Sequence, residues 1–169
     1  IAGNEQLNKY PLKGNNRFLT KGIYNGVETE IYSPHVITTT GSHELRGILP
    51  FISEQEAGNL DNLLYARVLQ ASIGFNKWNG IPLDAFGGLV PFKENRDVLG
   101  ILFLSSFLSG RAPEGGALLS VFMGGVRRPE LVDLPDEDIK AILAREVMSM
   151  TGLKEFKPDM LKITRYEHA

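Results

Sequence analysis

The fold is decided around one stretch, residues 84–106, which reads DAFGGLVPFKENRDVLGILFLSS. An aromatic residue, two glycines, a leucine and a proline precede a charged patch, and an almost wholly apolar run follows. An ordinary hairpin turn uses one glycine with polar residues beside it. Glycine lets another backbone or a flat ligand come close, and a phenylalanine beside it offers a stacking face. The stretch therefore predicts a strand next to an apolar corner, which either fills the core or forms a binding wall.

Several strands are expected around this corner. Asn25-Gly26 predicts a tight hairpin turn between two short strands, and residues 35–41 are interpreted as a third. A longer strand is expected within residues 65–75, where apolar and small or polar side chains alternate. Residues 98–105 and 117–123 are apolar almost throughout, which is typical of central strands that are covered on both faces.

Helices are expected in two places. Ser53 and Glu56 have the spacing of a capping box and predict the start of a short helix. Residues 136–150 carry an apolar stripe with acidic residues in the first turn, and Gly152 can end that helix. A last strand begins within residues 160–169. Because the elements follow no regular βαβ order, the sequence predicts an α+β fold with a mixed, largely antiparallel sheet and flanking helices.

The composition excludes several classes of function. The formal net charge is −2 with no basic stripe, so no nucleic acid partner is expected. The chain has no cysteine, which excludes thiolate catalysis and iron–sulfur ligation. The three histidines lack metal-ligand spacing, and neither GxGxxG, GxxxxGK nor GxSxG occurs. No metal site and no catalytic residue are therefore predicted within the chain.

The pair Gly124-Gly125, followed by VRRPE, leaves two interpretations. It could form an anion-binding nest of backbone amides with two arginines nearby. Alternatively, it ends a strand with a bulge and leaves the arginines exposed. The second interpretation is preferred, because a lone glycine pair is a weak signal.

Four stretches in combination resemble protoporphyrinogen oxidases of the FAD-containing amine oxidase superfamily: HVITTT, FGGLVPFKENRDVLGILFLSS, PEGGALLSVFMGG and KITRYEHA. The resemblance implies a flavoprotein oxidoreductase of haem biosynthesis that oxidises protoporphyrinogen IX to protoporphyrin IX. Complete members are much longer, so the chain is expected to be an internal fragment. Residues 1–41 then correspond to the end of the FAD-binding domain, and residues 42–169 to a truncated substrate-binding domain.

The resemblance also implies site residues. Phe86 is expected to lie along the porphyrinogen macrocycle, and Gly87 to let the backbone approach it. The substrate-binding and cofactor-binding positions carried over are Phe86, Gly87, Leu89, Leu99 and Phe122 for the substrate, and Thr38 and Thr39 for FAD. FAD is expected in the parent enzyme and not on the fragment, which is expected to be inactive alone.

Two alternatives stay open. The parent could oxidise coproporphyrinogen III or act as another flavin amine oxidase-type oxidoreductase. A different class would be a stand-alone module that binds a hydrophobic ligand. The expected location is cytoplasmic, with the parent peripheral at a membrane, and the exposed edges of the fragment are expected to promote dimers.

Overall fold

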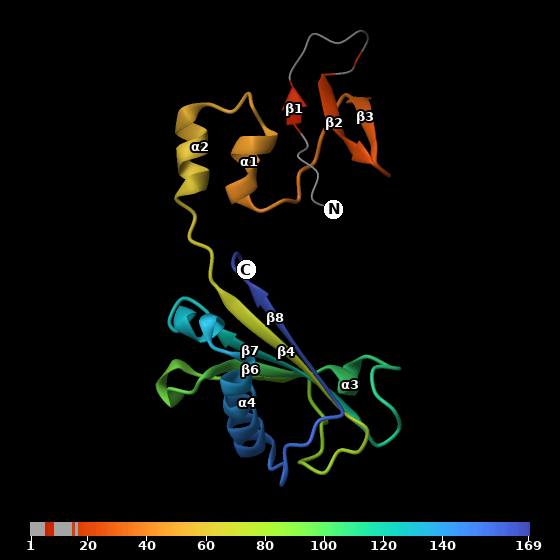
Figure 1. Ribbon diagram of the computed structural model, residues 1–169, viewed down its shortest axis with the longest axis vertical. Helices are drawn as coiled ribbons and strands as arrows, with labels where there is room; N and C mark the ends of the chain where they lie inside the picture. Colours follow the sequence, from red (N-terminus) through yellow and green to blue (C-terminus); the bar gives the residue numbers. More distant parts are fainter. Residues whose placement is uncertain (1–5, 9–14, 16) are drawn as a thin grey trace. The chain divides into compact units, whose positions relative to one another are not determined.

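The computed structural model describes residues 6–8, 15 and 17–169. The chain forms two compact units, one up to Leu64 and one from Tyr65 to Ala169 (Figure 1). This division groups residues 42–64 with the first unit. The predicted boundary between residues 41 and 42 separates two functional domains of a longer enzyme, and it stays a prediction.

The first unit is a small antiparallel sheet followed by two short helices. Its strands are β1 (Gln6–Asn8), β2 (Phe18–Tyr24) and β3 (Val27–Ser33), in the order β1-β2-β3. Asn25 and Gly26 join β2 to β3 with φ angles of 50° and 80°. Two consecutive positive φ angles are what a tight hairpin of this kind requires, so the predicted turn is confirmed.

The helices of this unit are α1 (Ser42–Ile48) and α2 (Glu54–Asp61). The predicted capping box is confirmed at α2, where the Ser53 hydroxyl accepts from the Glu56 N–H at 3.2 Å and a Glu56 carboxylate oxygen accepts from the Ser53 N–H at 2.9 Å. Helix α1 has no such signal, because Gly41 precedes it and makes no side-chain cap. The sequence therefore gave no indication of α1.

The predicted strand at residues 35–41 is wrong. Strand β3 ends at Ser33, and residues 35–39 have no regular secondary structure. Their β-branched side chains suit a strand, but a strand also needs a partner for its backbone groups. Among the described residues no strand pairs with this segment. Of residues 1–16, the structure describes only β1 and the turn residue Asn15.

The second unit is built on one five-stranded antiparallel sheet. The strands lie in the order β5-β6-β7-β4-β8. Their bounds are β5 (Gly87–Leu89), β6 (Val98–Phe103), β7 (Ala117–Gly124), β4 (Val68–Phe75) and β8 (Met160–Tyr166). Together with the helices this confirms the predicted α+β class with a largely antiparallel sheet.

One long helix, α4 (Asp136–Thr151), packs against one face of this sheet. Its buried stripe of Ile139, Leu143 and Val147 meets alternate residues of the strands, which on β4 are Leu69, Ala71, Ile73 and Phe75. Gly152 ends the helix with a φ of 64°, as predicted. Three short helices complete the unit: η1 (Phe92–Glu94), α3 (Leu104–Phe107) and η2 (Pro129–Asp133).

The prediction that β6 and β7 are covered on both faces is wrong. Val121 and Met123 of β7 are fully buried toward α4, but Leu118 and Phe122, which point to the other face, keep part of their surface exposed. Apart from Ser120, both strands are apolar on this second face although α4 covers only the first. That face is described below as the candidate site.

An arginine clamp joins β4 to the end of the chain. The Arg67 guanidinium donates to the two carboxylate oxygens of Asp133 at 2.8 and 2.6 Å, and to those of Glu167 at 2.6 and 3.2 Å. These hydrogen bonds lower the pKa of both carboxyl groups below their ordinary values. The clamp therefore stabilises the fold only while both carboxylates stay ionised.

We expect Arg67→Gln to make the acid sensitivity of folding smaller. Because the folded-state pKa values of Asp133 and Glu167 are lowered, their contribution to the free energy of unfolding is present above the unfolded pKa values of about 4 and is lost as the pH falls through the folded values. The urea concentration at the midpoint of unfolding is measured from neutral to acid pH. It should fall more steeply with decreasing pH for the unchanged chain than for the variant. Exposed Arg111, replaced by glutamine, is the control. Parallel curves for Arg67→Gln and the unchanged chain would contradict the clamp.

Candidate functional site

The sheet face opposite α4, here called the open face, carries side chains from all five strands of the second unit. The strand registers align one residue from each strand into a continuous row: Leu89, Gly100, Phe122, Gln70 and Thr164. The next row consists of Gly87, Leu102, Ser120, Ser72 and Lys162. Gly100 and Gly87 carry no side chains, so fewer side chains project from the β5–β6 side of this face. The face is therefore a broad surface with apolar side chains at its edge.

Two of the predicted substrate-binding residues meet in the first row. Leu89 is 86% exposed and its side chain lies over Gly100, 3.1 Å from where a β-carbon would stand. Phe122 is partly buried on the other side of Gly100. An 86% exposed leucine does not fill the core of the described chain. The open face thus brings Leu89 and Phe122 to either side of Gly100, with the Leu89 side chain over the glycine.

Phe86 lies at the end of β5 and makes a different contact. Its carbonyl accepts from the Phe103 N–H at 2.8 Å, and its ring centroid lies 4.7 Å from that of Phe107. The side chain is 69% exposed. The core-filling interpretation of the corner therefore does not fit Phe86 either, although its place along a ligand stays a prediction.

The pairing of β5 with β6 explains why residue 87 is a glycine. Its φ is 136°, and a β-carbon there would lie 2.0 Å from the Ile101 carbonyl oxygen on β6. The neighbouring Gly88 has nothing within 4 Å of the same position. The pairing of β5 with β6 thus requires glycine at position 87 and not at position 88. The expected approach of Gly87 to a ligand is a separate prediction.

Leu99 sits in a β-bulge. The register shifts between Val98, which pairs with Met123, and Gly100, which pairs with Phe122. A bulge re-aims the extra side chain and is frequent beside binding sites. The Leu99 side chain lies 3.3 Å from where a β-carbon on Gly125 would stand, and it lines a cavity of about 380 Å³ at this end of the sheet. Leu99 is therefore close to Phe122 along the strands, but its side chain lines this cavity and not the rows of the open face.

A polar cluster in the middle of the open face was not assigned a role from the sequence. The Gln70 amide nitrogen Nε2 donates to the Ser120 hydroxyl at 2.7 Å and to the Ser72 hydroxyl at 3.3 Å. Ser120 is buried and Gln70 keeps part of its surface exposed. The alternation within β4 put Gln70 and Ser72 on one face, but the link to Ser120 depends on the pairing with β7.

The Gly124-Gly125 pair ends β7, as the preferred interpretation predicted, but the bulge expected with it lies on β6, between Val98 and Gly100. Both residues have positive φ, 89° and 76°, and the Gly125 N–H donates to the Arg67 carbonyl at 2.7 Å. Since that amide is already used, it cannot serve an anion nest. The expected exposure holds for Arg127, whereas Arg128 is partly buried and ion-paired with Asp97 at 2.7 Å.

Thr38 and Thr39, the predicted flavin contacts, are exposed in the irregular segment of the first unit. Their contact with FAD stays a prediction. The chain has no glycine-rich phosphate motif, so these residues do not form a complete FAD site by themselves. In the part of the chain that the structure describes, no group of three potential metal ligands occurs. No helix among the described residues is long and apolar enough to cross a membrane.

Sequence comparison identifies relatives over most of the chain. Residues 29–168 match the family of flavin containing amine oxidoreductases. Protoporphyrinogen oxidase 1 of Arabidopsis thaliana chloroplasts is 31% identical over 131 residues, which cover 68% of this chain and 24% of that protein. The chain therefore spans about a quarter of the length of that relative.

Solved structures with the same fold carry different activities in their names. An engineered putrescine oxidase superimposes with a TM-score of 0.65 at 11% identity, over 95% of this chain and 33% of its own. Reduced UDP-galactopyranose mutase superimposes with a TM-score of 0.65 at 12% identity, over 89% of this chain and 32% of its own. At these identities the likeness shows the fold alone. With the family match over most of its length, the chain belongs to the flavin containing amine oxidoreductase family.

Proposed function

We propose that the chain is part of an FAD-dependent enzyme that oxidises protoporphyrinogen IX to protoporphyrin IX. The observation that carries the proposal is the row on the open face in which Leu89 and Phe122 flank Gly100. A large macrocycle needs a wide apolar surface with few projecting side chains, which this row provides. The similarity to a plant protoporphyrinogen oxidase supports the same substrate class.

The polar cluster fits the centre of such a ligand. A porphyrinogen carries four pyrrole N–H donors at its centre and is apolar around them. Gln70 uses its amide nitrogen on Ser120 and Ser72, which leaves its carbonyl oxygen to accept. One acceptor within an apolar wall would orient the macrocycle without a charged partner. Gln70 is thus our candidate for a residue that positions the ring.

FAD and the rest of the site belong to a longer protein in this proposal. The flavin would carry out the redox chemistry, and this chain would supply part of the macrocycle wall and, through Thr38 and Thr39, one flavin contact. A cytoplasmic location, peripheral membrane attachment of the longer enzyme, and dimers of the isolated chain through exposed strand edges remain parts of the same proposal.

Two alternatives differ in the substrate. Coproporphyrinogen III would use the same wall but carries four propionates, so it needs more cationic partners. An amine substrate, as the name of putrescine oxidase implies for that protein, needs acceptors or anions where the open face has Leu89, Phe122 and Leu102. A stand-alone module for a hydrophobic ligand would use the wall without any flavin. The apolar row favours a porphyrinogen over an amine.

The direct test is an assay of the protein encoded by the complete reading frame that contains these residues. Purified with FAD, it is offered protoporphyrinogen IX, coproporphyrinogen III and putrescine under air, and porphyrin fluorescence or hydrogen peroxide is recorded. We expect the fastest oxidation with protoporphyrinogen IX. Oxidation of putrescine alone, or binding of porphyrin with no flavin retained, would refute the proposal in favour of the corresponding alternative.

A further inference from the structure

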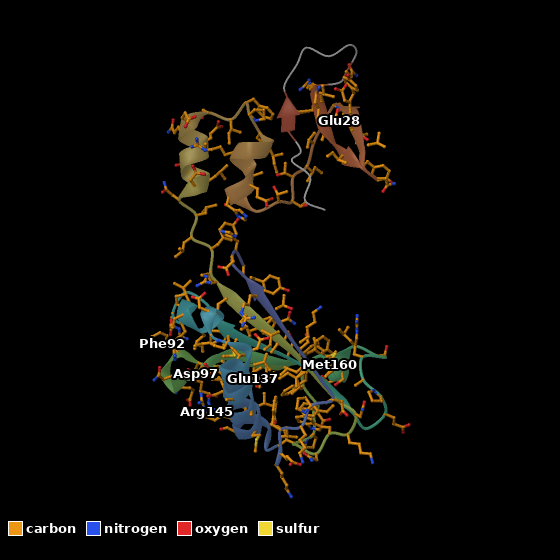
Figure 2. All side chains as sticks on the ribbon, viewed as in Figure 1. Glu28, Phe92, Asp97, Glu137, Arg145 and Met160 are labelled. Carbon is orange, nitrogen blue, oxygen red and sulfur yellow. The ribbon has the colours of Figure 1, made fainter. Side chains whose placement is uncertain are left out.

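The cavity beside Leu99 combines an apolar side with a cationic side. It has a volume of about 380 Å³ and lies between the loop that leads into β6 and the turn that follows β7. Figure 2 shows Phe92 and Asp97 on the first of these segments. The apolar lining includes Val90, Phe92 and Leu99, and the cationic lining is Arg96, Arg127 and Arg128. An apolar molecule with a negative charge is the kind of ligand that such a lining suits.

Arg128 is already neutralised by protein carboxylates. It donates to Asp97 at 2.7 Å and to Glu130 at 2.6 Å. Asp97 also pairs with Arg145, which α4 contributes to this end of the sheet. These contacts tie the β7 turn to the β6 loop and to α4. Arg128 is therefore a structural residue of the cavity wall.

Arg96 is neutralised as well, but Arg127 is not. Arg96 donates to the buried Glu146 at 2.9 Å. The Arg127 guanidinium carbon lies 3.8 Å from the centre of the Phe92 ring, and no carboxylate among the described residues pairs with it. Of the three arginines that line the cavity, Arg96 and Arg128 are thus paired with carboxylates, and Arg127 has no carboxylate partner among the described residues. The one positive charge left over is that of Arg127.

We propose that this cavity binds one carboxylate group of an apolar molecule through Arg127. The cation–π contact with Phe92 holds the Arg127 guanidinium over the ring without neutralising its charge, and a planar guanidinium fork matches a carboxylate. Leu99 lines the cavity and directly precedes Gly100, which shares a row with Leu89 and Phe122, so the cavity lies close along the chain to the proposed macrocycle wall. The carboxylate is then a propionate of the porphyrinogen, and this identification rests on the proposed function.

The carboxylate site is tested first without any porphyrin. Phenylpropionate, a small apolar carboxylate, is titrated into the isotope-labelled chain, and the Nε–H resonances of the arginines are followed by NMR. Arg127→Gln identifies the Arg127 resonance by its disappearance. We expect that resonance to move on titration and that of Arg111 to stay in place. An unmoved Arg127 resonance would overturn the inference.

The link to the porphyrinogen is tested with a charged and an uncharged form of one ligand. These are protoporphyrin IX and its dimethyl ester. The unchanged chain should bind the acid about tenfold more tightly than the ester, the order expected from one charge-assisted hydrogen bond. Arg127→Gln should lose this preference, while Arg111→Gln should keep it. Equal binding of both forms by the unchanged chain overturns the inference and leaves the macrocycle wall standing. If neither form binds but phenylpropionate moves Arg127, the carboxylate site stands and the proposed substrate is wrong.

Discussion

Gly87→Ala should release β5 from the edge of the sheet. The new β-carbon would lie 2.0 Å from the Ile101 carbonyl oxygen, and the φ of 136° is one that residues with side chains rarely adopt. The combined cost is about 3 kcal/mol or more, and opening the three-residue β5 is the nearest relief. The Phe103 N–H, which donates to Phe86 O, should then exchange with solvent roughly a hundredfold faster.

Gly88→Ala is the matched control, because nothing lies within 4 Å of its β-carbon position. It should leave the exchange rate of the Phe103 amide unchanged within a factor of about three, since substitutions at open surface sites change stability little. Amide exchange measured by NMR on both variants decides the matter. If Gly87→Ala keeps the Phe103 amide as protected as Gly88→Ala does, the glycine at 87 is not required by strand pairing. Its conformation would then have to be explained by a ligand.

The elements that could be predicted from the sequence are those with a local signal. The Asn25-Gly26 turn, the Ser53 cap and the Gly152 stop each depend on neighbouring residues, and all three are confirmed. The strand expected at residues 35–41 failed because pairing is not a local property. Helix α1 was missed because Gly41 caps it without a side-chain hydrogen bond. Local chemistry is visible in a sequence, and partners distant along the chain are not.

In the candidate site, too, features with a local signal could be predicted and features that depend on distant partners could not. The aromatic and glycine residues near residue 86 marked an apolar corner, and their exposure fits a wall more than a core. The Gln70–Ser120 hydrogen bond depends on the register of β4 with β7, so no pattern within β4 could reveal it. The unneutralised charge of Arg127 likewise depends on which carboxylates reach the arginines from α4 and from the loop before β6. Registers and ion pairs have to be seen in three dimensions.

Leu89→Ala should weaken the binding of protoporphyrin IX with little effect on folding. Leu89 is 86% exposed, so its truncation leaves no buried cavity and should change the free energy of unfolding by less than about 0.5 kcal/mol. A macrocycle lying on the open face would cover it. Losing that buried leucine surface is worth about 2 kcal/mol, or roughly thirtyfold in the dissociation constant. The measurement is a fluorescence titration of the chain with protoporphyrin IX, beside urea unfolding of the same variant.

Leu64→Ala supplies the comparison, because Leu64 is 81% exposed and lies outside the five-stranded sheet. Both variants remove the same side chain from an exposed position, so a general effect of surface hydrophobicity on porphyrin adsorption would weaken both equally. A ligand held on the open face weakens only with Leu89→Ala, because only Leu89 shares a row with Phe122. Equal loss in the two variants would mean that the porphyrin adsorbs without a defined place. The apolar row would then lose its role in the proposed function.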